Sequence, residues 1–189
     1  MKTILLFVED LGWAFRCKYN LWLHGPYGLA KIVEKIPFRF LVKYLRRYGA
    51  TVGDNCRFER GINLHRPLGQ KPFENLHIGN NVYLGHDTLI DLTEKVTLED
   101  DVIIASRCQV WTHASYYETK EEGKQYNEQR GPVTIGAGSI IYSGSVISHG
   151  VIIGPNAQIG ANSLVNKNIP ASAFAGGVPA KVITMKQEL

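Results

Sequence analysis

The sequence predicts an all-β fold: a parallel β-helix of hexapeptide repeats, with N-terminal α-helices and one loop extruded from the coil. Three observations predict it. A bulky aliphatic residue recurs at every sixth position from residue 135 to 165, a glycine or asparagine follows three positions after each, and one polar stretch interrupts the pattern. An α-helix repeats every ~3.6 residues and a plain strand every ~2, so a period of six indicates short strands joined by turns.

Each position of the repeat has its own chemistry. The aliphatic position holds Ile135, Ile141, Ile147, Ile153, Ile159 and Val165. The corner position holds residue types that adopt positive φ at low steric cost, namely Gly138, Gly144, Gly150, Asn156, Asn162 and Asn168. The position after the corner is usually small, as in Ser139, Ser145, Ala157 and Ser163. Three hexapeptides make one triangular coil, so Ile135 and Ile153 are expected to stack inside it.

The spacing of six continues towards the N-terminus, with changes of phase. Three sets of aliphatic or aromatic residues keep it: Leu98, Ile104 and Val110; Ile78, Leu84 and Ile90; and Val52, Phe58 and Leu64. The steps between the sets predict bulges or loops at corners of the coil. The largest interruption, residues 114–132, reads ASYYETKEEGKQYNEQRGP and lacks the aliphatic period. It predicts a loop thrown out from a β-helix domain that spans residues 51–185.

Residues 1–50 form a separate basic segment, with nine Lys/Arg and three Asp/Glu. Apolar residues from Leu29 to Tyr48 fall at roughly helical spacing, which predicts an amphipathic helical segment. Pro37 is expected to separate two helices, and Gly49 to cap the second. Two interpretations stay open: the helices pack on the open end of the coil, which would otherwise expose strand edges, or they rest on an anionic membrane.

Length and composition restrict the remaining classes of protein. The 189 residues suit one domain with appendages. Cys56 and Cys108 fall on the small inward position and are expected to be buried thiols, which suits a reducing compartment. The apolar run from Ile4 to Val8 is too short to cross a membrane and lacks a signal-peptide cleavage pattern, so we expect a cytoplasmic protein. No nucleic-acid partner is expected, because the basic residues alternate with core-type aliphatics.

One histidine of six has an informative context. The stretch QVWTHASYY places His113 where the regular coil stops and the long loop begins. A side chain there is expected to lie in a cleft between coil and loop. The alternative is a surface histidine without a role. Cys108 is near in sequence, but its inward position predicts a core thiol.

Motifs along the coil carry a family resemblance. They are LHIGNNVYLG, VTIGAGSIIYSGSVI and NKNIPASAFAGGVPAKVI. Together they cover roughly residues 50–185, which resemble the left-handed β-helix acyltransferases of the galactoside, maltose and xenobiotic O-acetyltransferase branch. The left-handedness of the coil is implied by this resemblance. The basic N-terminal segment leading into RRYGATVGDNC is similar to the subgroup that O-acetylates surface polysaccharides.

The resemblance implies a reaction and its residues. The histidine before the loop is the family's general base, which corresponds to His113. A base is needed because a sugar hydroxyl is a poor nucleophile, whereas acetyl-CoA carries an activated thioester. Direct attack requires no metal and no acyl-enzyme. Acetyl-CoA is implied to lie in a groove between subunits of a homotrimer, against Ser143, Gly144 and Ala161.

Further contacts are implied for both substrates. The amide of Ser143 is a candidate oxyanion donor. Lys167 and Lys181 correspond to the basic residues near the nucleotide phosphates, and Lys186 is a looser match. Ile140 stands where many relatives have a groove aromatic, for which Tyr142 is a substitute.

The acceptor site departs further from the family. Its polar contact to the sugar falls on Gly85, so His86 and Asp87 are expected to serve instead. Tyr116 and Tyr117 in the loop are candidates for stacking on a sugar, or for packing that holds the loop down.

Three other functions make different demands on the sequence. An N-acetyltransferase acting on an amino sugar needs the same base, so His113 does not discriminate against it. A β-helix carbonic anhydrase needs a cluster of zinc-binding histidines, and the next histidine after His113 is His149. A non-catalytic scaffold predicts no acetyl-CoA binding and no effect of changing His113.

Overall fold

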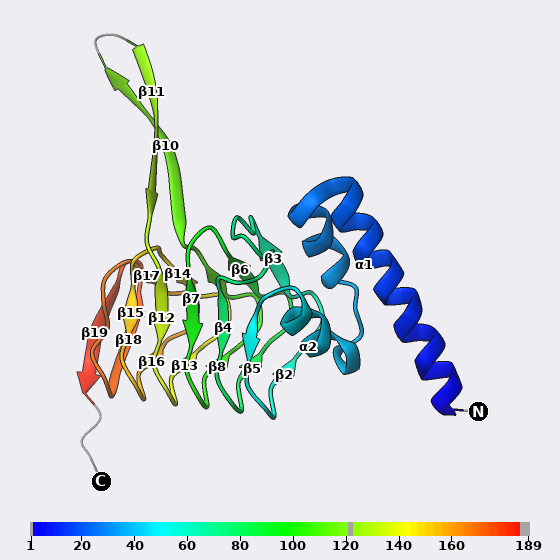
Figure 1. Cartoon of the computed structure of the whole chain (residues 1–189). Helices are drawn as coiled ribbons and strands as arrows, with labels where there is room; N and C mark the ends of the chain where they lie inside the picture. The colour runs from blue at the N-terminus through cyan, green and yellow to red at the C-terminus, as the bar shows by residue number, and fades with distance from the viewer. Residues whose placement is uncertain (1, 121–122, 186–189) are drawn as a thin grey trace.

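The fold is a triangular coil of short parallel strands, shown by a computed structural model that describes residues 2–120 and 123–185 (Figure 1). Three sheets form its sides. Sheet 1 contains β1 (Thr51–Val52), β4 (Leu76–Ile78), β7 (Val96–Leu98), β12 (Val133–Ile135) and β15 (Ile152–Ile153). Sheet 2 contains β2 (Arg57–Phe58), β5 (Tyr83–Leu84), β8 (Ile103–Ile104), β13 (Ile140–Ile141), β16 (Gln158–Ile159), β18 (Ala173–Gly177) and the antiparallel β19 (Ala180–Met185). Sheet 3 contains β3 (Asn63–His65), β6 (Leu89–Asp91), β9 (Gln109–Val110), β14 (Val146–Ile147) and β17 (Leu164–Val165).

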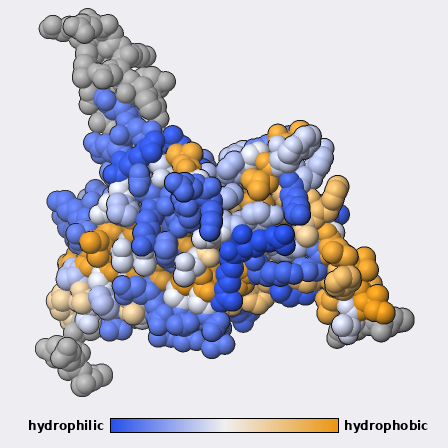
Figure 2. All heavy atoms as spheres, viewed as in Figure 1, coloured by the Kyte–Doolittle hydropathy of each residue, from blue (hydrophilic) through white to orange (hydrophobic). Residues whose placement is uncertain are grey.

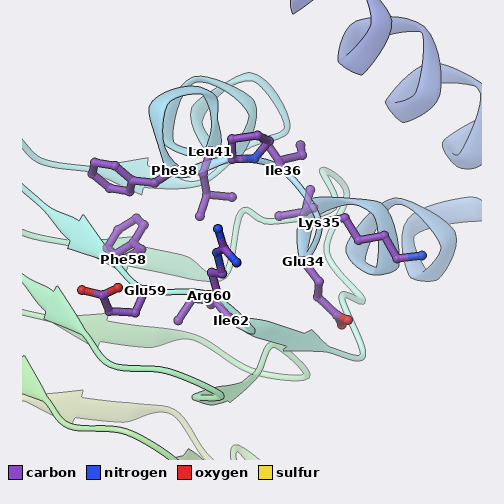
Figure 3. Close-up of a pocket in the computed structure, with 11 residues that line it drawn as sticks. Glu34, Lys35, Ile36, Phe38, Leu41, Phe58, Glu59, Arg60 and Ile62 are labelled. Carbon is purple, nitrogen blue, oxygen red and sulfur yellow. The ribbon is translucent and has the colours of Figure 1, made fainter. Parts of the chain in front are cut away.

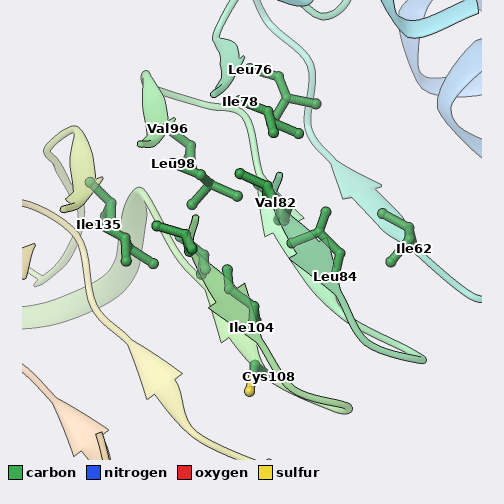
Figure 4. Close-up of a cluster of buried hydrophobic side chains, with 14 of the residues drawn as sticks. Ile62, Leu76, Ile78, Val82, Leu84, Val96, Leu98, Ile104, Cys108 and Ile135 are labelled. Atoms are coloured by element: carbon green, nitrogen blue, oxygen red, sulfur yellow. The ribbon is translucent and has the colours of Figure 1, made fainter. Parts of the chain in front are cut away.

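The aliphatic period builds the core, as predicted. Ile135 lies in register with Ile153 on the next coil and with Leu98 on the previous one, and all three are buried. Figure 4 shows this ladder continuing through Ile78, with the side chains inside the coil. Each such side chain contributes ~1.5–3 kcal/mol of transfer free energy on burial, so the ladder is the main source of stability.

The corner residues of the repeat have the predicted positive φ, with one exception. Asn156 and Asn162 have φ of 56°, and Gly144 has φ of 76°. At Gly144 an added Cβ would come within 2.2 Å of Asn162 Oδ1, so the corner requires glycine. Asn168 is not among the positive-φ residues of the described chain. Its side-chain Oδ1 instead accepts a hydrogen bond from the Ile152 amide at 2.8 Å, which explains the asparagine there.

All three changes of phase occur at the same edge of the triangle. We call this the insertion edge; it joins sheet 3 to sheet 1 and consists of residues 66–75, 92–95, 111–132, 148–151 and 166–168. Its first three turns carry the extra residues. The edge that joins sheet 2 to sheet 3 has short turns throughout; we call it the tight edge, and it consists of residues 59–62, 85–88, 105–108, 142–145 and 160–163.

The predicted extruded loop is a β-hairpin rather than an irregular loop. β10 (His113–Lys120) pairs antiparallel with β11 (Gly123–Arg130), and His113 lies opposite Arg130 at the base. Figure 1 shows the hairpin projecting from the coil. Cross-strand pairing satisfies backbone groups that an extruded loop would leave to solvent, which accounts for the difference.

The basic N-terminal segment forms α1 (Lys2–Val33) and α2 (Phe38–Arg47), with Pro37 between them as predicted. Gly25 has non-helical φ and ψ and kinks α1. Gly49 has φ of 112° just beyond the end of α2, as expected of a cap. Leu41, Tyr44 and Leu45 of α2 are buried, and α2 lies beside β1 at the first coil (Figure 1). Most of the apolar residues from 29 to 48 are therefore used in packing.

Candidate active site

The insertion edge gathers two histidines, an aspartate and a tryptophan from three successive coils. His65 ends β3, Asp91 ends β6 in register with it, and Trp111 and His113 follow β9. Each lies where a strand leaves the regular period. The extra residues at this edge therefore allow polar side chains from neighbouring coils to contact one another.

His113 is held by a buried carboxylate. Its Nδ1 lies 2.7 Å from Asp91 Oδ2, and its side chain is 11% exposed whereas that of Asp91 is fully buried. Thr93 Oγ1 lies 3.1 Å from the same Nδ1. The imidazole is therefore fixed on one side by two oxygens.

Asp91 accepts several hydrogen bonds. Thr112 donates to Oδ2 from its backbone N–H at 2.9 Å and from its hydroxyl, and Thr93 Oγ1 donates to Oδ1 at 2.9 Å. Burial alone would raise the pKa of Asp91, but the hydrogen bonds from Thr112, His113 and Thr93 outweigh burial and leave the pKa below its usual value. Asp91 is therefore a carboxylate at neutral pH.

The carboxylate determines the tautomer of His113. An ionised carboxylate only accepts hydrogen bonds, so Nδ1 must carry the proton. The Thr93 hydroxyl is already donating to Asp91, so it too faces the Nδ1 proton as an acceptor. This leaves the lone pair on Nε2, the nitrogen directed away from Asp91. An imidazole in this state can accept a proton at Nε2 while Asp91 stabilises the resulting cation.

Aromatic rings pack around His113. The ring of His65 stacks on it at 5.9 Å with an interplanar angle of 10°, and Trp111 meets it edge-on at 6.0 Å. Burial lowers the pKa of His65 further than nearby Asp91 raises it. His65 therefore stays neutral at pH 7 and adds no positive charge beside His113.

The base of the hairpin is tied to the coil next to these rings. Arg66, which follows His65, donates to Glu128 on β11. Arg130 donates to the other Glu128 oxygen at 3.2 Å. The Arg66 and Arg130 hydrogen bonds lower the pKa of Glu128. The hairpin thus leaves the coil at a defined angle over the His113 site.

The predicted cofactor residues occupy the tight edge, away from His113 in the same chain. Ser143 and Ala161 are exposed on successive turns, joined where Asn162 N donates to Ser143 O at 3.0 Å. Within the described residues the Ser143 N–H has no hydrogen-bond acceptor. Sheet 3 separates this edge from the insertion edge, so one chain does not bring His113 and Ser143 together.

The other predicted cofactor residues are spread over the surface. Lys167 is exposed on the insertion edge, and Lys181 is exposed on β19 at the far end of sheet 2. Ile140 is half-buried on β13, whereas Tyr142 is exposed on the tight edge. Lys186 lies outside the described residues.

The acceptor candidates also divide between the two edges. Gly85, His86 and Asp87 lie on the tight edge, in the same column as Ser143. An added Cβ at Gly85 would lie 2.5 Å from the Ser106 amide nitrogen, so no side chain fits at the position where relatives are expected to have a polar contact. His86 and Asp87 are exposed, with His86 Nε2 3.6 Å from Glu59. Tyr116 and Tyr117 lie in β10, but their side chains are outside the described residues.

Sequence reasoning missed the partners of His113. Asp91, Thr93 and His65 were not predicted, because single polar residues near a change of phase have no fixed facing. No local signal marks Asp91. It directly follows the inward residue Ile90, a position that faces solvent on a regular strand, but both residues are buried because the alternation breaks at the end of β6.

Cys108 is a core residue, as predicted. Its side chain is fully buried beside the Tyr142 carbonyl, and burial raises the pKa of the thiol. A nucleophilic cysteine needs the opposite shift. Cys108→Ala is expected to keep turnover within about threefold of the parent and to lower the free energy of unfolding by about 1–2 kcal/mol. Initial rates and urea unfolding measure both, and a loss of turnover above 100-fold at retained stability would contradict this.

No group of three or more potential metal ligands occurs within the described ranges. In the same residues, no helix combines the length and hydropathy required to cross a bilayer.

Comparisons with known proteins match this architecture. The model of the family "Bacterial transferase hexapeptide (six repeats)" matches residues 132–167. The chain carries the bacterial transferase hexapeptide repeat. Galactoside O-acetyltransferase of Escherichia coli (strain K12) is 38% identical over 136 residues, which cover 71% of this chain and 63% of that protein. The match thus spans less than two thirds of that relative's own length.

Two solved structures extend the likeness to most of the chain. A maltose O-acetyltransferase from Clostridium difficile 630 superimposes with a TM-score of 0.72 at 26% identity, covering 93% of this chain and 89% of that one. A galactoside acetyltransferase in complex with coenzyme A gives 0.65 at 28% identity, covering 85% and 80%. The predicted resemblance to the galactoside and maltose branch is confirmed, and with it the left-handed β-helix.

Proposed function

We propose that this chain is an acetyl-CoA-dependent O-acetyltransferase that modifies a sugar hydroxyl. The observation that carries the proposal is the imidazole of His113, fixed by the buried carboxylate of Asp91 on a coil similar to O-acetyltransferases. Acetyl-CoA is the proposed donor because a relative of this fold is solved with coenzyme A. All three cysteines are buried and free, which suits the proposed cytoplasmic location.

The proposed reaction is one direct transfer. His113 Nε2 takes the proton of the acceptor hydroxyl as its oxygen attacks the thioester carbonyl carbon. The backbone N–H of Ser143 donates to the developing oxyanion. The carbon–sulfur bond then breaks, and the thiolate of CoA receives the proton from His113, so the enzyme returns to its starting state. Neither a metal nor an acyl-enzyme takes part.

The separation of the two edges supports a site shared between chains. His113 lies on the insertion edge and Ser143 on the tight edge of the same coil, with one sheet between them. In a homotrimer whose threefold axis runs parallel to the axis of the coil, the insertion edge of one chain can face the tight edge of its neighbour. The proposed site then takes its base from one chain and its oxyanion donor from the next.

Mixing two inactive variants tests the shared site. His113→Ala removes the base, and Ala161→Arg places a long side chain in the proposed cofactor groove. After the two are unfolded and refolded together in equal amounts, about one quarter of sites receive an intact half from each chain, so about one quarter of parental activity should return. Each variant refolded alone is the control. No recovery, in mixed trimers verified by mass, would contradict a shared site.

The proposed acceptor is a carrier-linked saccharide of a surface polysaccharide. Because Gly85 has no room for a side chain, His86 and Asp87 are the proposed polar contacts, and Tyr116 and Tyr117 of the hairpin stay candidates for stacking on the sugar. Lys167 and Lys181 are proposed to meet the CoA phosphates. An amino-sugar acceptor remains the second candidate, because an amine also needs a base.

Product analysis tests the reaction type. The chain is incubated with acetyl-CoA and a panel of galactosides, maltosides and amino sugars, and CoA release is followed with a thiol reagent. An acetyl ester is cleaved by hydroxylamine, whereas an acetamide is stable. Ester products confirm O-transfer, and exclusively stable products would assign the chain to N-acetyltransferases.

A further inference from the structure

The outer face of α1 is apolar and has no partner among the described residues. Its stripe recurs every three or four residues and consists of Ile4, Val8, Leu11, Phe15, Tyr19 and Trp22, between 48% and 80% exposed. The spacing places them on one side of the helix. Consistent with this, the rings of Phe15 and Tyr19 stack at 6.2 Å, and those of Tyr19 and Trp22 lie 6.5 Å apart.

The opposite face of α1 already performs the packing. Cys17 is fully buried, and Trp13 and Leu21 pack partly buried against the core. The Tyr44 hydroxyl of α2 donates to the backbone carbonyl of Asp10 at 2.8 Å. The outer stripe therefore makes no packing contact that the fold requires. Figure 2 shows hydrophobic residues concentrated at the end of the molecule where Figure 1 places α1.

The charges on α1 divide between the same two faces. Its two acidic residues are neutralised by α2, since Glu9 pairs with Arg39, and Asp10 pairs with Lys43 at 2.5 Å. Arg16 and Lys18 flank the outer stripe and form no ion pair in the described residues. Around the stripe the helix is therefore purely cationic.

The N-terminal end of α1 distinguishes a lipid surface from a protein partner. Leu5, Leu6 and Phe7 are exposed together with Ile4 and Val8, and five consecutive residues point to all sides of a helix. A groove on another protein covers one side. Acyl chains can surround the whole turn, while the hydroxyl of Tyr19 and the indole N–H of Trp22 reach the headgroups.

We infer that α1 lies in the surface of an anionic membrane, with its N-terminal turns among the acyl chains. The cations beside the stripe meet acidic headgroups, and the coil stays in the aqueous phase. A cavity of about 530 Å³ between the helices and the first coil then lies near the membrane. Its lining includes Phe38, Leu41 and Phe58 together with Glu59 and Arg60, whose guanidinium points towards Leu41 (Figure 3). An acceptor linked to a lipid carrier would reach the tight edge from that side.

Vesicle sedimentation of the full chain tests the inference. We expect binding to vesicles containing phosphatidylglycerol, weaker binding to phosphatidylcholine alone, and release by salt. Phe15→Gln with Trp22→Gln should weaken binding at least about tenfold, and Arg16→Gln with Lys18→Gln should abolish the preference for anionic lipid. Ile152→Gln, which removes an apolar side chain 52% exposed on β15, is the matched control and should bind like the parent.

Several outcomes would overturn the inference. They are no vesicle binding by the parent, equal binding by the Phe15/Trp22 variant, or equal binding to neutral and anionic lipid. If the same variant binds vesicles normally but changes the sedimentation coefficient in solution, the stripe is covered by another copy of the chain. Turnover of a soluble sugar by this variant should match the parent, which separates the membrane inference from the proposed activity.

Discussion

His113→Ala should lower turnover by about 10² to 10⁴, with the KM for acetyl-CoA changed by no more than about threefold. The effect is large because, among the described residues of this edge, the imidazole alone has both a free lone pair and a buried counter-charge. The cofactor is proposed to lie along the neighbouring chain, so its affinity does not depend on the imidazole. Steady-state rates of CoA release at saturating acetyl-CoA measure the loss.

His149→Ala is the matched control. His149 is a half-buried histidine on the same insertion edge, three coils nearer the C-terminus than His65 and one beyond His113. It has no carboxylate partner among the described residues, and its replacement should leave turnover within about twofold. Equal losses in the two variants would show that the edge is sensitive to any change, and parental turnover in His113→Ala would refute the general-base assignment.

Asp91→Asn should lower turnover about 100-fold while leaving the KM for acetyl-CoA unchanged. Every group around Asp91 Oδ2 donates a hydrogen bond, so an amide NH2 there would oppose a donor. An amide carbonyl would still accept from Nδ1 but carries no charge to stabilise the imidazolium. The free energy of unfolding should also fall by about 1–3 kcal/mol.

Thr93→Val separates positioning from stability. It removes one donor to Asp91 and one contact to His113 but keeps the carboxylate. We expect a loss of turnover below about tenfold, with a fall in stability of about 1 kcal/mol. If Thr93→Val lost as much turnover as Asp91→Asn, the charge of Asp91 would not be the important property.

The repetitive part of the fold was predictable because each hexapeptide repeats one local rule. Ile135 and Ile153 stack as expected, since a strand, a corner and a small residue recur without interruption. The hairpin was predicted only as an extruded loop. Its polar sequence shows that it leaves the coil, but cross-strand pairing depends on partners across a turn.

The candidate site was predictable only in part. His113 was identified from its place at the end of the regular period and from the family resemblance. Asp91 was not, because a change of phase moves a residue to a different face without a local signal. The division of Ser143 and His113 between two edges follows from the winding of the coil, which no local motif encodes.

The sequence alone likewise did not show which apolar residues of the N-terminal segment stay exposed. Helical spacing drew attention to the segment from Leu29 to Tyr48, much of which is buried. The run from Ile4 to Val8 is too short to cross a membrane, and its sequence does not show whether its side chains pack or stay exposed. Its exposure became visible once α1 was seen to pack with its opposite side.

Calorimetric titration of acetyl-CoA into the parent and into His113→Ala tests the central claim most directly, with CoA as the control ligand. We expect both proteins to bind acetyl-CoA at about one site per chain, with affinities within about threefold of each other, because the cofactor groove does not include the base. Absence of binding at millimolar acetyl-CoA in the parent would contradict the acetyltransferase assignment and leave the coil as a scaffold without this chemistry.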